Sequence, residues 1–94
     1  MEREYGSERA GKIRTRLDLL RAAANLAQVP ASSPTRRHEL KGNLKGRYAV
    51  DLTGNYRLVF EPNHEPIPVK DDGGIDLRAV TAIRVLSVED YHHG

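Results

Sequence analysis

The sequence lacks cysteine and tryptophan, and it contains a single phenylalanine. Without cysteine the chain can form neither a disulfide nor a thiolate metal site. No apolar run approaches the roughly 20 residues of a membrane-spanning helix, and the polar N-terminal stretch contains no apolar signal-peptide segment. These absences exclude a disulfide scaffold and a membrane-spanning helix, so we expect a soluble cytoplasmic protein with no membrane partner.

The length of 94 residues, of which 38% are hydrophobic, suits one small domain that covers residues 1–94. The formal net charge is only +2, but the charges are unevenly distributed. The segment from Arg36 to Arg47 contains five basic residues and one acidic residue, whereas residues 61–76 are mostly acidic. A local basic stripe indicates a phosphate-rich partner on one surface. The alternative is a solvated loop with no ligand.

Apolar residues at helical spacing predict a helix in the first third of the chain. Ser7 is a suitable N-cap, and the helix should end by Gln28, because Pro30 disfavours helical geometry in the preceding residue. The apolar stripe consists of Ile13, Leu17, Leu20 and Ala24. The basic residues that lie mostly on the other side, as a solvated face or a surface near nucleic acid, are Arg9, Lys12, Arg14, Arg16 and Arg21.

Three later segments have the character of strands. Residues 47–52 and 55–60 alternate between apolar and polar positions, which predicts two half-buried strands. Thr53-Gly54 between them predicts a tight turn with glycine at a positive φ. Residues 79–88 predict a third strand, with Ile83 and Val85 on one face and Arg84, Leu86 and Val88 on the other.

Residues 61–78, between the second and third strands, show no periodicity and form a long excursion. The predicted fold class is therefore α+β, with an N-terminal helix packed on an antiparallel sheet of about three strands.

The sequence contains no nucleotide-binding glycine motif, no HExxH and no nucleophile elbow. It does contain proton-transfer and phosphate-binding side chains, namely His38 and Lys41 in a glycine-flanked loop, Arg57 in the second strand, and Asp90, Tyr91 and His92 after the third. Cleavage of RNA by transesterification needs a base for the ribose 2′-OH, cations for the phosphorane and an acid for the departing 5′ oxygen. It needs no metal or cofactor. From the residues alone, a structural or disordered Tyr-His pair and a solvated lysine are the more common interpretations.

The segment HELKGNLKGRYAVDLTGNYRLVFEP, followed after a gap by VTAIRVLSVEDYHH, resembles the HigB branch of the RelE/ParE toxin superfamily. The shared features are a His-x-Leu-Lys-Gly loop, a second Lys-Gly pair, an aromatic-Ala-Val strand, an aromatic-Arg-Leu strand that ends near Phe, and a terminal Asp-Tyr-His. The resemblance covers nearly the whole chain, and the combination in this order is specific.

This resemblance implies a toxin of a type II toxin–antitoxin system, a plasmid-maintenance killer protein that cleaves mRNA in the ribosomal A site. It implies a helix-turn-helix antitoxin as partner, with operator DNA bound only through the toxin–antitoxin complex. The catalytic residues that it implies are His38, Lys41, Arg57, Asp90, Tyr91 and His92. The residues that are expected to contact RNA by their charge are Arg36, Arg37, Lys45 and Arg47.

The sequence departs from the family in two places. Family members begin with a strand and a further helical segment, and from the resemblance we expect that strand and part of the helical segment to be absent here, which would leave one edge of the sheet unpaired. The long segment 61–78 replaces a tight turn. The alternatives that stay open are a non-catalytic RNA-binding or regulatory module, a gyrase-directed toxin on the same scaffold, and a fragment that folds only with its antitoxin.

Overall fold

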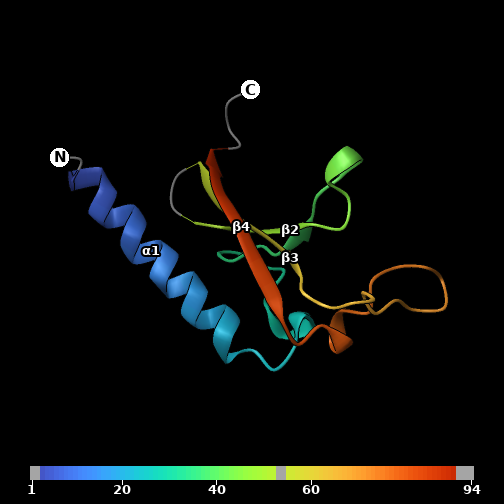
Figure 1. Ribbon diagram of the computed structural model, residues 1–94. Coiled ribbons are helices and arrows are strands. Elements are labelled where there is room, and N and C mark those ends of the chain that lie inside the picture. Colours follow the sequence, from blue (N-terminus) through green and yellow to red (C-terminus); the bar gives the residue numbers. More distant parts are fainter. Residues whose placement is uncertain (1–2, 53–54, 91–94) are drawn as a thin grey trace.

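The computed structural model describes residues 3–52 and 55–90 and contains one long helix beside one antiparallel sheet (Figure 1). The helix α1 spans Arg3–Ala22. The strands are β1 (His38–Glu39), β2 (Tyr48–Asp51), β3 (Tyr56–Pro62) and β4 (Ile83–Asp90), in the spatial order β1-β2-β3-β4. The predicted α+β class is therefore confirmed, with the two-residue strand β1 added to the three that the sequence indicates. None of the described helices is long and apolar enough to cross a membrane.

The start of α1 differs from the prediction, and its end, which precedes Gln28 as predicted, leaves Ala24 of the predicted stripe outside the helix. The helix begins at Arg3, so Ser7 lies within it and is not its N-cap. At the other end, Ala23 donates to the Leu19 carbonyl at 3.2 Å, but the next amide, of Ala24, donates to the Gln28 side chain at 3.1 Å. This side chain takes the place of the carbonyl that would continue the ladder, so the helix ends at Ala22 and a short 3₁₀ helix, η1 (Leu26–Gln28), follows.

The hairpin of β2 and β3 follows the alternation in the sequence. Tyr48 pairs with Phe60 and Val50 pairs with Leu58 on the face that α1 covers, whereas Ala49 pairs with Val59 on the opposite face. The predicted Thr53-Gly54 turn lies outside the described residues. Because the side chains of a strand alternate between its faces, the hairpin contributes to both sides of the sheet.

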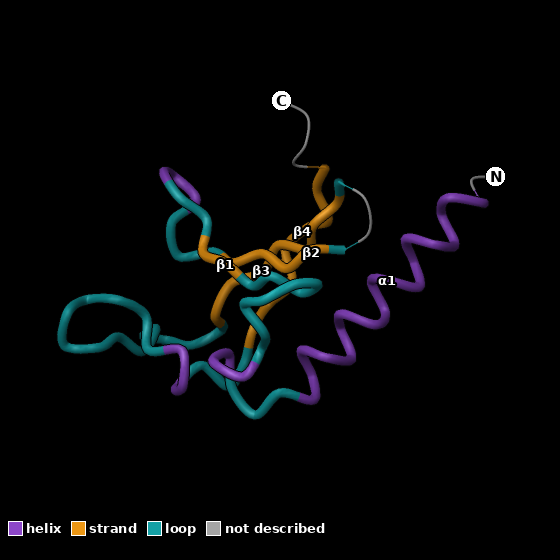
Figure 2. The backbone as a smooth tube through the Cα atoms, turned by 180° about the vertical axis from the view of Figure 1, so that it is seen from behind, coloured by secondary structure: helices purple, strands orange, loops and turns teal. Residues whose placement is uncertain are grey.

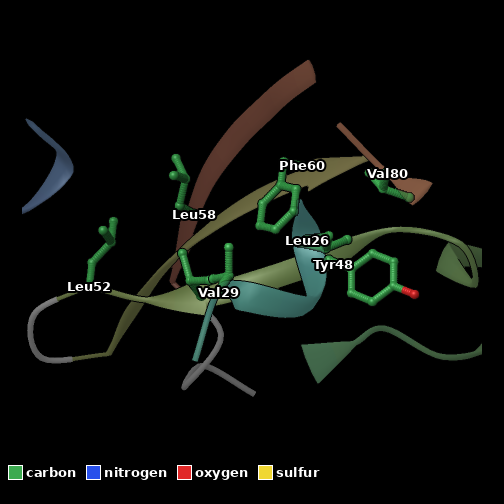
Figure 3. Close-up of a cluster of buried hydrophobic side chains, with 8 residues drawn as sticks. Leu26, Val29, Tyr48, Leu52, Leu58, Phe60 and Val80 are labelled. Atoms are coloured by element: carbon green, nitrogen blue, oxygen red, sulfur yellow. The ribbon is translucent and has the colours of Figure 1, made fainter. Parts of the chain in front are cut away.

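The main core lies between the sheet and the segments from α1 and η1 that cover it. Figure 3 shows its buried side chains grouped over strands β2 and β3. Phe60, its largest fully buried side chain, stacks against Tyr48 with ring centroids 6.2 Å apart. The buried members are Leu26, Val29, Tyr48, Val50, Leu52, Leu58, Phe60 and Val80. A smaller cluster of Leu40, Ala49 and Val59 lies on the other face. The sheet therefore has a covered face toward α1 and a second, more open face.

Strand β4 contains a bulge that changes which of its side chains share a face. Val59 pairs with Ser87 but its neighbour Phe60 pairs with Val85, so Leu86 is an extra residue. Val88 pairs with Leu58 and therefore lies on the same face as Val85. The predicted grouping of Val88 with Arg84 was wrong, because a period of two does not survive an inserted residue.

Residues 63–82 form the long excursion between β3 and β4, which projects away from the sheet in Figures 1 and 2. Near its tip, Val69 and Ile75 form an isolated antiparallel bridge, and the Lys70 amide donates to the Gly74 carbonyl at 2.7 Å. The excursion ends in a short 3₁₀ helix, η3 (Leu77–Ala79), so β4 begins at Ile83 and not at the predicted residue 79. The segment is thus an ordered turn and not only a linker.

Candidate nucleic-acid interface

A row of charged side chains crosses one end of the open sheet face. The register pairs Asp51 of β2 with Arg57 of β3, and Arg57 with Glu89 of β4, so these side chains lie on one face. Arg57 approaches Glu89 at 3.6 Å, and Arg36 approaches Asp51 at 3.3 Å. The resulting row, Arg36-Asp51-Arg57-Glu89, alternates in sign.

Arg57 is the most enclosed cation of this row. Its side chain is 18% exposed, compared with 58% for Arg36 and 45% for Glu89. A guanidinium in contact with carboxylates is held in one geometry, because its planar donors fit their oxygens. The strand therefore holds Arg57 in place, as a phosphate-binding residue requires.

Asp90 does not join this row. It pairs with Tyr56, and successive residues of a strand point to opposite faces, so Asp90 and Arg57 lie on opposite sides of the sheet. The register brings Arg57 together with Glu89 instead. Tyr91 and His92 lie outside the described residues.

His38 lies on the same open face as Arg57, in strand β1. It pairs with Ala49, and its Nδ1 is 2.7 Å from the Arg36 carbonyl oxygen. Because a carbonyl oxygen only accepts, Nδ1 carries the hydrogen, so that in the neutral form of the ring Nε2 is the proton acceptor. This is the tautomer that a general base needs at Nε2.

Lys41 lies at the other end of the sheet from Arg57. Strand β1 runs away from the charged row, since His38 pairs with Ala49 and the Leu40 amide donates to the Arg47 carbonyl at 2.8 Å. Strand spacings of about 4.8 Å and a rise of about 3.4 Å put the Cα atoms of His38 and Arg57 roughly 12 Å apart, with Lys41 farther away. The described candidates therefore spread along the open face and do not form one compact cluster.

The loop after β1 carries two exposed lysines, Lys41 and Lys45, on either side of the 3₁₀ helix η2 (Gly42–Leu44). Gly42 and Gly46 have φ values of +67° and +95°, which favour glycine and set the path of this loop. Neither lysine forms an ion pair with another described residue. We refer to residues 41–46 as the lysine loop.

The arginines of the basic stripe form contacts within the chain. Arg37 donates from Nε to the Val29 carbonyl at 2.9 Å, and Arg47 lies 3.8 Å from Glu61. Arg36 is paired with Asp51, as described above. Of the four predicted RNA contacts, Lys45 is thus the one whose side chain no described carboxylate or carbonyl engages.

Arg16 was expected on the solvated side of the helix, and this was wrong. The residue is buried, with 6% of its surface exposed, and its Nε donates to the Asp51 carbonyl at 2.7 Å. Its position three residues after Ile13 and four before Leu20 puts it at the margin of the apolar stripe, where a long side chain reaches the sheet. That spacing is the feature of the sequence that indicates burial of Arg16.

Among the side chains that the structure describes, those of residues 10–52 and 55–90, no three histidine or carboxylate groups lie close enough together to hold a metal ion. Comparison of the chain with protein-family models, with curated proteins and with solved structures found no match in any of the three.

Proposed function

We propose that this chain is a toxin of a type II toxin–antitoxin system, a cytoplasmic, HigB-like endoribonuclease that cleaves mRNA on the ribosome. The observation that carries the proposal is Arg57, a partly enclosed guanidinium on a sheet face that also presents the proton-accepting Nε2 of His38. The resemblance of the sequence to HigB toxins supplies the class of substrate and the reaction.

In this proposal the scissile phosphate lies on the open sheet face beside Arg57. Removal of the 2′-OH proton lets that oxygen attack the phosphorus, and protonation of the departing 5′ oxygen completes the transesterification. Arg57 stabilises the charge on the phosphorane. Glu89 is the more exposed member of the ion pair, so it is the group that an incoming phosphate displaces from Arg57.

The sequence offers His38, Lys41, Asp90 and His92 as general bases, and Asp90 is set aside because it lies on the opposite face of the sheet from Arg57. His38 has the geometric support described above, because its Nδ1 hydrogen is directed to the Arg36 carbonyl. Lys41 and Lys45 extend the cationic surface toward the flanking nucleotides. In the cell, a helix-turn-helix antitoxin would cover this surface.

The test combines growth and cleavage. Expression of the chain should arrest growth, and primer extension on a reporter mRNA should find cuts only when programmed ribosomes translate it. Lys41→Ala and His92→Ala should relieve the arrest without unfolding the chain. Lys70→Ala, which removes an exposed lysine from the excursion, is the matched control and should leave toxicity intact. Full toxicity in the first two variants would rule out the assigned site.

The spread of the described candidates favours a second function, a non-catalytic RNA-binding module. Asp90 lies on the opposite face from Arg57, and Lys41 lies at the far end of the sheet. A binding module of this kind would show salt-sensitive affinity for RNA and yield no cleavage product. A gyrase-directed toxin would give neither result but would inhibit supercoiling of plasmid DNA.

A further inference from the structure

Strand β4 is the long edge of the sheet. Among the described residues it pairs with β3 alone, and in Figure 1 it lies in front of β2 and β3 with α1 to one side. Its free side therefore presents backbone donors and acceptors along a strand of eight residues. An edge of this length is a template for another strand unless charges, proline or a covering segment blocks it.

The middle of β4 is apolar and exposed. Val85, Leu86 and Val88 are 44%, 37% and 38% exposed. A hollow of about 370 Å³ borders the same strand, and its lining includes Leu17 and Leu20 of α1. An apolar edge beside an apolar hollow marks an interaction surface.

We propose that β4 pairs antiparallel with β4 of a second copy of this chain, which joins two sheets of four strands into one continuous sheet. This edge adjoins the open face to which we assign RNA and shares Glu89 with it. The inference nevertheless does not depend on the proposed function.

The first argument is the charge pattern of β4. In an antiparallel pairing centred between Leu86 and Ser87, Arg84 lies opposite Glu89 of the second copy, and Val85 lies opposite its Val88. Each contact occurs twice by symmetry. Opposite charges and apolar pairs directly across a ladder are both favourable, so the strand is complementary to itself.

The second argument is the bulge. Residues that pair across a sheet must lie on the same face, and in a regular strand Arg84 and Glu89 lie on opposite faces. The extra residue Leu86 changes this, because Arg84 pairs with Glu61 and Glu89 pairs with Arg57 on the open face. Likewise Val85 and Val88 both lie on the α1 face. The bulge thus makes the self-complementary register possible.

The third argument is continuity with the apolar hollow. Ile83 and Val85 line it from β4, and Arg21 lines it from α1. The second copy would bring its Val88 opposite Val85 and its Asp90 opposite Ile83, close to Arg21. The pairing would therefore close the open side of the hollow with an apolar group and a carboxylate near a cation.

The test uses two variants with reversed charge. Sedimentation equilibrium over a wide concentration range should show a dimer for the wild-type chain. Arg84→Glu places glutamate against Glu89 of the second copy, and Glu89→Arg places arginine against its Arg84, so each variant alone should be monomeric. A mixture of the two restores opposite charges at both contacts and should double the measured mass.

The control is a pair of charge reversals away from the edge, Arg14→Glu and Glu65→Arg, at exposed positions. Each should remain dimeric alone. Arg84 and Glu89 also form ion pairs within their own chain, so the edge variants must be checked for folding. Circular dichroism should show that all four variants are folded. A monomeric wild-type chain at every concentration, or dimers of both edge variants alone, would overturn the proposal.

Cysteine cross-linking tests the register, because the natural chain contains no cysteine. A mixture of Val85→Cys and Val88→Cys chains should form a disulfide between copies under mild oxidation, since directly opposed residues meet the distance that a disulfide needs. Val85→Cys alone should form little disulfide, because the thiols of the two copies lie three residues apart along the paired β4 strands. Equal cross-linking in both samples would contradict this register.

Discussion

At the scale of single residues, Tyr48 makes the stability of the core depend on pH. Burial raises the pKa of the Tyr48 phenol above its ordinary value of 10.0, and the neighbouring Glu39 carboxylate raises it further, whereas Arg37 opposes the rise. The folded chain therefore keeps a proton that the unfolded chain releases. The stability that this provides is complete below pH 10.0 and is lost as the pH rises through the raised pKa.

We therefore expect the free energy of unfolding to fall more steeply above about pH 10 in the wild-type chain than in Tyr48→Phe, which has no phenol to ionise. Urea denaturation at several alkaline pH values measures this difference, and the variant controls for the other titrating groups. Parallel pH profiles for the two chains would show that Tyr48 ionises equally in both states.

Arg16 is a second residue whose role can be measured. Its Nε donates to the Asp51 carbonyl at 2.7 Å and so ties α1 to the end of β2. Arg16→Met keeps most of the aliphatic stem but removes the donor, and should lower the free energy of unfolding by about 1–2 kcal/mol. Arg14→Met, at an exposed position, should change it by less than about 0.5 kcal/mol. Similar urea midpoints for the two variants would contradict the structural role.

At the scale of elements, Gly11 weakens the middle of α1. A Cβ added there meets no atom within 4 Å, so alanine fits without a clash. Gly11→Ala should stabilise the fold by about 0.5–1 kcal/mol, because glycine loses more backbone entropy in a helix. Gly46→Ala should destabilise it, although space is also open there, since φ is +95°. Thermal melts that moved both variants in the same direction would contradict this assignment.

The elements differ in how well the sequence predicts them. The hairpin of β2 and β3 was predicted because its alternation of apolar and polar residues is local. Apolar residues such as Leu58 and Phe60 indicate which face of the strand is buried. Strand β1 was missed because two residues carry no periodicity. The bulge at Leu86 and the resulting register depend on pairing with β3, which sequence patterns within β4 do not encode.

The same difference applies to the candidate site. The sequence placed Arg57 on the face away from Leu58 and Phe60, and the structure confirms this placement. Its partner Glu89 was not predicted, because a shift of one residue in the register decides whether Glu89 or Asp90 faces it. Long-range register is therefore what the sequence alone could not supply.

At the scale of the whole molecule, the basic and acidic segments lie next to each other. A hollow of about 550 Å³ is lined by Lys45 and Gly46 of the lysine loop and by Asp72 of the excursion. Figures 1 and 2 show both segments on the same side of the sheet. The near-neutral total charge thus reflects an acidic loop beside a basic one, and the acid weakens the attraction that the lysines exert on a phosphate.

This arrangement predicts opposite effects of two substitutions on RNA binding. Lys45→Ala should weaken the affinity for single-stranded RNA and lower the slope of log affinity against log salt by about 0.7, the value for one phosphate contact. Asp72→Asn should strengthen the affinity at low salt, because it removes the nearby negative charge. The asparagine oxygen can still accept the hydrogen bond that the Gly74 amide donates to Asp72 at 2.8 Å. Glu65→Gln, an exposed acid outside the lining of this hollow, is the matched control. Fluorescence anisotropy at a series of salt concentrations measures all three. If Asp72→Asn and Glu65→Gln changed the affinity equally, the effect would come from net charge, and the lysine loop would not be the binding surface.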